Sequence, residues 1–164
     1  MMIPEAISAK LNEQTTAEFE ASHKYLAMAC ALDQMGMKIL SKWFVRQAAE
    51  EREHAMQFID YLQQVGASVV LDAVPKPKEK NRTVKEIVQA ALDSELAITQ
   101  RINELAALCE AENDYATRSF VNKFVDEQVE EVSTMTDLLE MVELAGDNLL
   151  QIEMHLQYEM TAKG

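Results

Sequence analysis

The helix-breaking residues of this chain stand at a few positions only, and they leave four long stretches uninterrupted. Gly36, Gly66 and Gly146 each follow a stretch in which apolar residues recur every three or four positions, the period of an amphipathic α-helix. Only 6% of the residues are aromatic, whereas Ala, Leu, Glu and Gln are abundant, which favours helix over sheet. No stretch alternates apolar and polar residues as a strand would, so the sequence predicts an all-α fold.

The spacing of these breaks also predicts how the helices are connected. The predicted helices lie in one domain of residues 1–164 and span about residues 4–35, 38–65, 83–110, 114–144 and 148–159. Thr83 and Glu86 have the spacing of a capping box at the start of the third helix. Short links after the first and third helices make antiparallel neighbours, while ASVVLDAVPKPKEKNR is long enough to cross the whole bundle. We therefore expect a four-helix bundle with one long crossover and a short fifth C-terminal helix.

The charge of the chain limits its partners. The net charge is −13, which argues against nucleic acid, because phosphates need cationic side chains, and which attracts cations. No apolar run reaches the roughly 20 residues that a membrane span needs, and MMIPEAISAK lacks the features of a secretion signal. The expectation is a cytoplasmic protein that contacts no membrane. Cys30 and Cys109 have no CxxC spacing and are expected to be buried free thiols.

The apolar seam of each predicted helix contains polar residues near its middle. In the first helix the seam consists of Leu11, Glu18, Tyr25 and Leu32, beside Gln14, Ala21, Met28 and Met35. In the second it consists of Leu40, Phe44, Gln47, Glu51, His54, Phe58, Tyr61 and Val65. In the third it consists of Val84, Val88, Ala91, Glu95, Ile98, Ile102, Leu105 and Cys109. In the fourth it consists of Val121, Phe124, Gln128, Glu131, Met135, Leu138, Val142 and Ala145.

The polar seam residues predict a metal centre inside the bundle. The groups that would face one another are four carboxylates, one imidazole and one amide: Glu18, Glu51, Glu95, Glu131, His54 and Gln128. An unpaired buried carboxylate costs several kcal/mol, and no Lys or Arg lies on these seams to neutralise the set. A lone seam Glu is usually a surface residue, but polar groups at mid-helix on all four helices need a cation. Oxygen-rich ligands with a single imidazole suit iron or manganese better than zinc.

Four segments resemble the non-haem ferritins of bacteria and archaea: NEQTTAEFEASHKYLAM, FVRQAAEEREHAMQFIDYLQQVG, SELAITQRINELAAL and FVDEQVEEV. The resemblance covers nearly the whole chain, and EEREHA with the Glu-Gln pair of the fourth helix is its most specific part. It implies a ferritin-like domain with a ferroxidase that oxidises Fe(II) with O2 or H2O2. It also implies a homo-oligomeric shell of 24 subunits that stores and detoxifies iron as ferric mineral.

The resemblance implies site residues as well. The first iron would be held by Glu18, Glu51 and His54, and the second by Glu51, Glu95 and Gln128. Tyr25 matches a ferritin tyrosine that donates one electron. A third iron, as in bacterial and archaeal ferritins, would be held by Glu50, Glu127, Glu130 and Glu131. In isolation Glu127 and Glu130 are as easily read as a solvated helix face.

The chain also departs from related patterns. Bacterioferritins carry a second Glu-x-x-His where this chain has Gln128 and Glu131, and their haem-ligating Met is replaced by Arg52, so no haem is expected. The acidic pair of the threefold channel in animal ferritins corresponds to Arg118 and Val121, which argues against iron entry there. Similarity to ferritins would place the fifth helix, with Ile152, His155 and Leu156, at fourfold axes.

The unequal ligand sets predict a mechanism. The neutral amide of Gln128 should make the second site weaker, so that iron is loaded, oxidised and released inward instead of being kept as a permanent cofactor. Two other functions stay open on the same bundle. One is a di-iron oxygenase or rubrerythrin-like peroxidase, which usually has a second Glu-x-x-His or a Cys-rich domain. The other is a shell or interaction protein without activity, against which the polar seam argues.

Overall fold

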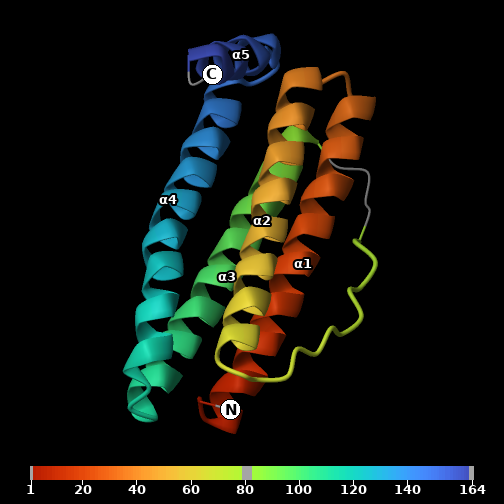
Figure 1. Cartoon of the computed structure of the whole chain (residues 1–164). Coiled ribbons are helices and arrows are strands. Elements are labelled where there is room, and N and C mark those ends of the chain that lie inside the picture. Colours follow the sequence, from red (N-terminus) through yellow and green to blue (C-terminus); the bar gives the residue numbers. More distant parts are fainter. Residues whose placement is uncertain (1, 79–82, 163–164) are drawn as a thin grey trace.

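The protein consists of five helices in a computed structural model that describes residues 2–78 and 83–162 (Figure 1). They are α1 (Glu5–Gln34), α2 (Lys38–Gln64), α3 (Val84–Ala111), α4 (Tyr115–Ala145) and α5 (Leu150–Ala162). No strand occurs among the described residues, and none of their helices is long and apolar enough to cross a membrane. The predicted all-α fold, a four-helix bundle with a short fifth helix, is confirmed.

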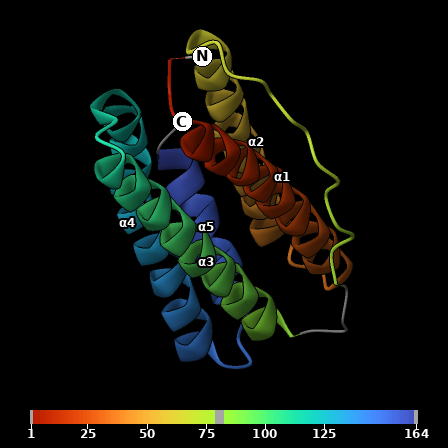
Figure 2. The ribbon, with the colours of Figure 1, turned by 90° about the horizontal axis from the view of Figure 1, so that it is seen from below.

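The crossover between α2 and α3 sets the topology. Helices α1 and α2 form one antiparallel pair, and α3 and α4 form the other (Figures 1 and 2). Residues 65–78 run along the outside of the bundle on the α1 side, and α3 starts at the end of the bundle where α2 also starts (Figure 1). Helix α5 lies across that same end and contacts α2 and α4. Each of the four long helices therefore passes the middle of the bundle.

Gly36, Gly66 and Asn113 follow the C-terminal ends of α1, α2 and α3. At Gly36, which has a φ of 85°, the amide of Met37 donates a hydrogen bond to the carbonyl of Leu32. This is a Schellman motif, which needs a residue in the left-handed region. Gly66 ends α2 in the same way, and Asn113, with a φ of 55°, does so after α3. Such closed ends allow the short links that keep neighbouring helices antiparallel.

The start of α3 is a capping box, as its sequence predicts. The backbone amide of Glu86 donates to Oγ1 of Thr83 at 3.2 Å, and the backbone amide of Thr83 donates to Oε2 of Glu86 at 2.8 Å. These two bonds satisfy amides that have no partner within the helix. The long crossover therefore ends at a defined residue.

A polar layer divides the core into two apolar clusters. One cluster includes Tyr25, Phe44 and Met135, and the other includes Phe58, Ile102 and Phe124. The seam residues predicted from periodicity are buried or half-buried, except Met35, which is 42% exposed beside the end of α1. Between the clusters lie four buried polar side chains: Glu18, Glu51, Glu95 and Gln128. The layer lies at mid-bundle, where carboxylates are least accessible to water.

Helix α5 packs against its own subunit. Ile152 and Leu156 are 3% and 2% exposed and belong to the cluster that includes Phe44. These two side chains are therefore buried within the single chain, and the position of the fifth helix at a fourfold axis stays a prediction. His155 is exposed, with Nε2 3.4 Å from Oε1 of Glu159.

Glu153 of α5 caps the start of α2. Helix α2 has no side-chain cap of its own, but the backbone amides of Ile39 and Leu40 donate to the two carboxylate oxygens of Glu153 at 2.8 and 2.9 Å. We expect Glu153→Ala to lower the free energy of unfolding by about 1 to 2 kcal/mol, because two helix N-terminal amides lose a charged acceptor. Calorimetric unfolding measures this, with Glu159→Ala as the control. Equal stability of the two variants would contradict this role for Glu153.

Candidate metal centre

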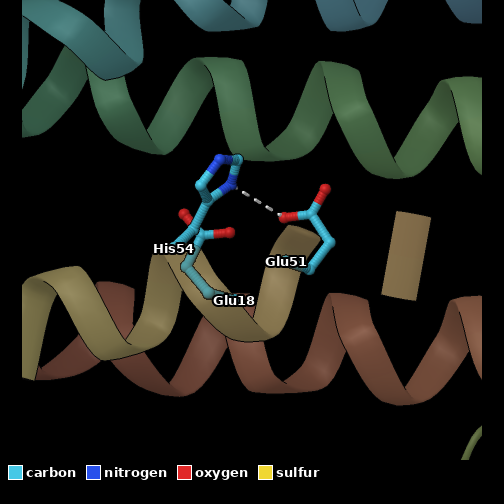
Figure 3. A group of neighbouring side chains, drawn as sticks. All are labelled: Glu18, Glu51 and His54. Atoms are coloured by element: carbon cyan, nitrogen blue, oxygen red, sulfur yellow. Dashed lines mark ion pairs between the residues drawn. The ribbon is translucent and has the colours of Figure 1, made fainter. Parts of the chain in front are cut away.

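Three side chains from two helices converge in the polar layer (Figure 3). Glu18 comes from α1, whereas Glu51 and His54 lie three residues apart on α2 and so share one face of that helix. One ligand atom from each residue lies within 4.8 Å of the other two. Nδ1 of His54 is 3.4 Å from Oε2 of Glu51. Among the described residues, no other group of three His, Cys, Asp or Glu side chains has this geometry.

The electrostatics of this group favour a bound cation. Glu18 and Glu51 are 1% and 2% exposed, and Oε2 of each has no hydrogen-bond partner. Burial, and next the charge of Glu51, raise the pKa of Glu18 well above its ordinary value. Burial, and next the charge of Glu95, raise the pKa of Glu51 to about 8. At neutral pH the metal-free centre would therefore hold protons that a metal ion displaces on binding. Two carboxylates and an imidazole are a suitable donor set for Fe(II).

Gln14 fixes the orientation of Glu18. It lies one turn earlier on α1, is 2% exposed, and its Nε2 donates to Oε1 of Glu18 at 2.7 Å. This bond occupies one carboxylate oxygen and leaves Oε2 for a metal ion. Helical periodicity places Gln14 on the seam but indicates no role for it at the site. Its spacing of four residues before Glu18 is the signal that identifies it.

A second group lies beside the first and is held together by hydrogen bonds. The hydroxyl of Tyr25 donates to Oε1 of Glu95 at 2.5 Å. Nε2 of Gln128 lies 3.2 Å from Oε2 of Glu95 and 3.1 Å from Oγ1 of Thr99. Both oxygens of Glu95 already accept hydrogen bonds, so Glu95 must share or exchange one of them to bind a metal ion. Burial, and next the charge of Glu95, raise the pKa of Tyr25 well above its ordinary value.

The remaining carboxylates surround these two groups. Glu131 is half-buried, and burial, followed by the charges of Glu95 and Glu50, raises its pKa to about 7. Oε2 of Glu127 lies 3.4 Å from Nε2 of His54, on the side of the imidazole away from Glu51. Glu50 accepts a hydrogen bond from Gln47 at 3.1 Å, and Glu130 is exposed. Glu127 thus extends the first group toward the surface, while Glu130 makes no contact with it in the hydrogen bonds and ion pairs of the described residues.

Four residues outside the centre, which the sequence also singles out, differ in burial and contacts. Cys30 is exposed, contrary to its prediction as a buried thiol, whereas Cys109 is buried. Val121 is fully buried in the subunit core and therefore does not line a surface channel. Arg118 forms an ion pair with Glu110 at 2.9 Å, so its charge is partly balanced within the chain.

Comparisons with known proteins agree with the fold. Residues 8–145 match the sequence profile of the ferritin-like domain family, Ferritin. The chain is 36% identical to Ferritin BfrB of Mycolicibacterium smegmatis over 156 residues, which cover 95% of this chain and 86% of that protein. It is 36% identical to the bacterial non-heme ferritin of Staphylococcus epidermidis over 147 residues, which cover 90% of this chain and 89% of that protein.

A structural comparison gives the same answer. The fold is similar to that of an open pore ferritin from the hyperthermophilic archaeon Archaeoglobus fulgidus, with a TM-score of 0.92 and 34% sequence identity. The similarity covers 94% of this chain and 96% of the archaeal one. The resemblance inferred from the four sequence segments is therefore confirmed, and the chain belongs to the ferritin family.

Proposed function

We propose that each subunit of this ferritin oxidises Fe(II) with O2 or hydrogen peroxide at a di-iron centre. Copies of the chain would assemble into a hollow shell of 24 subunits that retains the ferric product. Membership of the family supports iron storage. The observation that carries the ferroxidase proposal is the group of Glu18, Glu51 and His54, in which two buried carboxylate oxygens have no hydrogen-bond partner.

In this proposal Glu51 is shared between two iron ions. Glu18 and His54 complete the first site, and Glu95 and Gln128 complete the second. The proximity of Glu51 to Glu95 supports the shared role, because the charge of Glu95 is the second-largest cause of the raised pKa of Glu51. A bridging carboxylate would hold both ions within reach of one oxidant molecule, so that two electrons are delivered together.

The second site should be the weaker of the two. The hydrogen bonds that Glu95 accepts from Tyr25 and Gln128 must be shared or lost when iron binds there. Gln128 also offers a neutral amide where a carboxylate would attract the ion more strongly. A weak second site allows iron to bind, react and leave. This supports the handling of iron as a substrate for storage and not as a permanent cofactor.

Gln128→Glu should make the second site bind iron more tightly and release it more slowly. The new carboxylate would add negative charge beside Glu95, and we expect Fe(II) at the second site to bind about tenfold more tightly or more. Anaerobic Fe(II) titration measures this binding, and repeated aerobic additions measure turnover, which should slow because the product leaves less readily. Asn122→Asp, which adds the same charge on an exposed position of α4, is the control. Unchanged Fe(II) affinity in Gln128→Glu would contradict the assignment of Gln128.

Gln14→Leu should weaken the first site without removing a metal ligand. Loss of the hydrogen bond to Oε1 of Glu18 frees the carboxylate to turn, and we expect a fall of about tenfold in Fe(II) affinity, a typical effect of losing a residue that orients a ligand. Stopped-flow oxidation at subsaturating Fe(II) checks this. Thr16→Ala is the control, because its hydroxyl bonds only the helix backbone, at Asn12. Identical kinetics in Gln14→Leu and the unchanged protein would exclude this positioning role.

We further propose a third iron position at the edge of the centre, formed by Glu50, Glu127, Glu130 and Glu131. Burial and neighbouring negative charges raise the pKa of Glu131, which supports a cation beside it. Glu127 lies close to His54, which supports a third position directly beside the first site. Ferric ions would pass over these carboxylates as they leave the di-iron centre.

The surface of the chain supports assembly. Large apolar side chains on α4 and α5 are mostly solvent-exposed in the single chain: Leu144, Leu150, Met154 and Tyr158. Burying them against neighbouring copies would be favourable. A shell of chains that each carry a charge of −13 would also concentrate Fe(II) near the protein.

Aerobic addition of Fe(II) to the purified protein tests the proposed function. We expect rapid growth of ferric absorbance and co-elution of the iron with a large particle during size-exclusion chromatography. The same particle without added Fe(II) and a protein-free Fe(II) solution are the controls. A small species that turns over Fe(II) without retaining iron would contradict storage and would favour a di-iron oxygenase or peroxidase.

A further inference from the structure

A continuous series of aromatic rings joins the metal centre to the half-buried Tyr61, seven residues after His54 on α2. The imidazole of His54 meets the ring of Phe124 edge-on at 5.6 Å between centroids. Phe124 stacks on Phe58 at 4.4 Å, and Phe58 meets Phe120 edge-on at 5.5 Å. Phe120 then stacks on Tyr61 at 4.0 Å, with their planes 7° apart. The rings therefore leave no gap between the centre and the phenol.

The hydroxyl of Tyr61 begins a hydrogen-bonded path for a proton. It lies 2.9 Å from Oγ1 of Thr117, whose hydroxyl donates to Oδ2 of Asp114 at 2.5 Å. Because the single hydroxyl hydrogen of Thr117 is directed to Asp114, Tyr61 is the donor in the first bond. A phenol loses an electron far more readily when its proton can leave in the same step. Tyr61 is thus arranged for coupled loss of an electron and a proton.

We propose that Tyr61 is a remote one-electron donor to the metal centre, acting through the rings of Phe120, Phe58 and Phe124. This inference rests on the proposed ferroxidase function. Seven helical residues correspond to about 10 Å, a distance over which electrons can tunnel through packed protein. Nζ of Lys123 lies 4.9 and 4.7 Å from the centroids of Phe120 and Phe124. Its positive charge disfavours an oxidised state on those rings, so the radical resides on Tyr61.

Donation of an electron by Tyr61 is needed when only the first, stronger site holds iron. Reduction of hydrogen peroxide to water takes two electrons, and a single Fe(II) supplies one. Tyr61 supplies the other: one Fe(II), one phenol, one Asp114 carboxylate, one hydrogen peroxide and two protons from solvent give one Fe(III), one phenoxyl radical, one protonated Asp114 and two waters. The O–O bond breaks, and the phenol proton passes through Thr117 to Asp114. A later Fe(II) and a proton restore the phenol and yield a second Fe(III).

The test is a freeze-quench electron paramagnetic resonance measurement on the whole shell. One Fe(II) per subunit is loaded anaerobically and mixed with one equivalent of hydrogen peroxide. The variants share Tyr25→Phe, which removes the tyrosine bonded to Glu95. We expect a tyrosyl radical in Tyr25→Phe, its loss in Tyr25→Phe/Tyr61→Phe, and its retention in Tyr25→Phe/Tyr115→Phe, because Tyr115 is 71% exposed and outside the stack. Trapped hydroxyl radical should rise in Tyr25→Phe/Tyr61→Phe.

Two results would overturn the role of Tyr61: a radical of equal size in Tyr25→Phe/Tyr61→Phe, or none in Tyr25→Phe when Fe(II) oxidation by O2 in the unchanged protein is rapid. Absence of rapid oxidation in the unchanged protein would instead overturn the proposed function. Size-exclusion chromatography of each variant checks that the shell is intact. Thr117→Val provides a second test of the proton path, because the radical should form more slowly when Tyr61 has lost its acceptor.

Discussion

Glu18→Ala and His54→Ala are each expected to abolish rapid Fe(II) oxidation while the proposed shell still assembles. Each substitution removes one of the three ligands in the group that carries the proposal. Loss of several kcal/mol of stabilisation of the metal-bound transition state corresponds to about 100-fold or more in rate. Stopped-flow absorbance of the ferric product measures the rate, and size-exclusion chromatography measures assembly.

Matched controls exist for both substitutions. Glu20→Ala removes a carboxylate from the outer part of α1, where it pairs with Lys24 at 2.7 Å. His155→Ala removes an exposed imidazole from α5. Both controls should oxidise Fe(II) as the unchanged protein does. If Glu18→Ala and His54→Ala also oxidise Fe(II) at the rate of the unchanged protein, the assignment of the first site is wrong.

The metal-free protein is expected to lose stability as pH rises from 4.5 to about 8, because the carboxyl of Glu51 has a pKa of about 8 instead of 4.5. Below pH 4.5 both the folded and the unfolded chain keep this proton, and the protonated carboxyl of Glu51 makes its full contribution to stability. Between the two values the folded chain binds more protons than the unfolded chain, so the free energy of unfolding falls with pH. Glu131, with a pKa of about 7, also lowers the free energy of unfolding as pH rises. Calorimetric unfolding of chelator-treated protein measures the trend.

A bound metal ion should reverse this loss. It replaces the protons of the centre and stabilises the folded state by its binding free energy, so Zn(II) should raise the unfolding temperature more at pH 8 than at pH 5. Glu51→Gln is the control, because its neutral amide removes the contribution of Glu51 and should make the pH dependence less steep. The explanation fails if the metal-free protein becomes more stable between pH 4.5 and about 8. It also fails if the free energy of unfolding of Glu51→Gln depends on pH as steeply as that of the unchanged protein.

Helical periodicity alone was enough to locate the buried carboxylates. Glu95 lies on a seam that also contains Ala91, Ile98 and Ile102, and all four side chains are buried. A residue at a seam position must enter the core because the period of the helix fixes which face it occupies. The same argument holds for the capping box at Thr83, whose two bonds lie within four residues. Local spacing determines features of this kind, and they were predicted with their residue numbers.

Features that depend on how distant segments dock were not predictable in this way. Glu153 contacts the start of α2 across 114 residues, and nothing near it in the sequence specifies that partner. The bonds of Tyr25 and Gln128 to Glu95 depend on side-chain rotamers inside a packed core. The usual burial of free cysteines predicts that Cys30 lies in the interior, yet it is exposed on α1.

The di-iron centre can be tested directly by a crystal structure of the protein loaded anaerobically with Fe(II), with iron located by its anomalous scattering. We expect two iron ions in each subunit, both coordinated by Glu51, one with Glu18 and His54 and the other with Glu95 and Gln128. The second position should have the lower occupancy at limiting Fe(II). Iron bound only outside the polar layer, or a single ion that does not contact Glu51 at saturating Fe(II), would contradict this expectation.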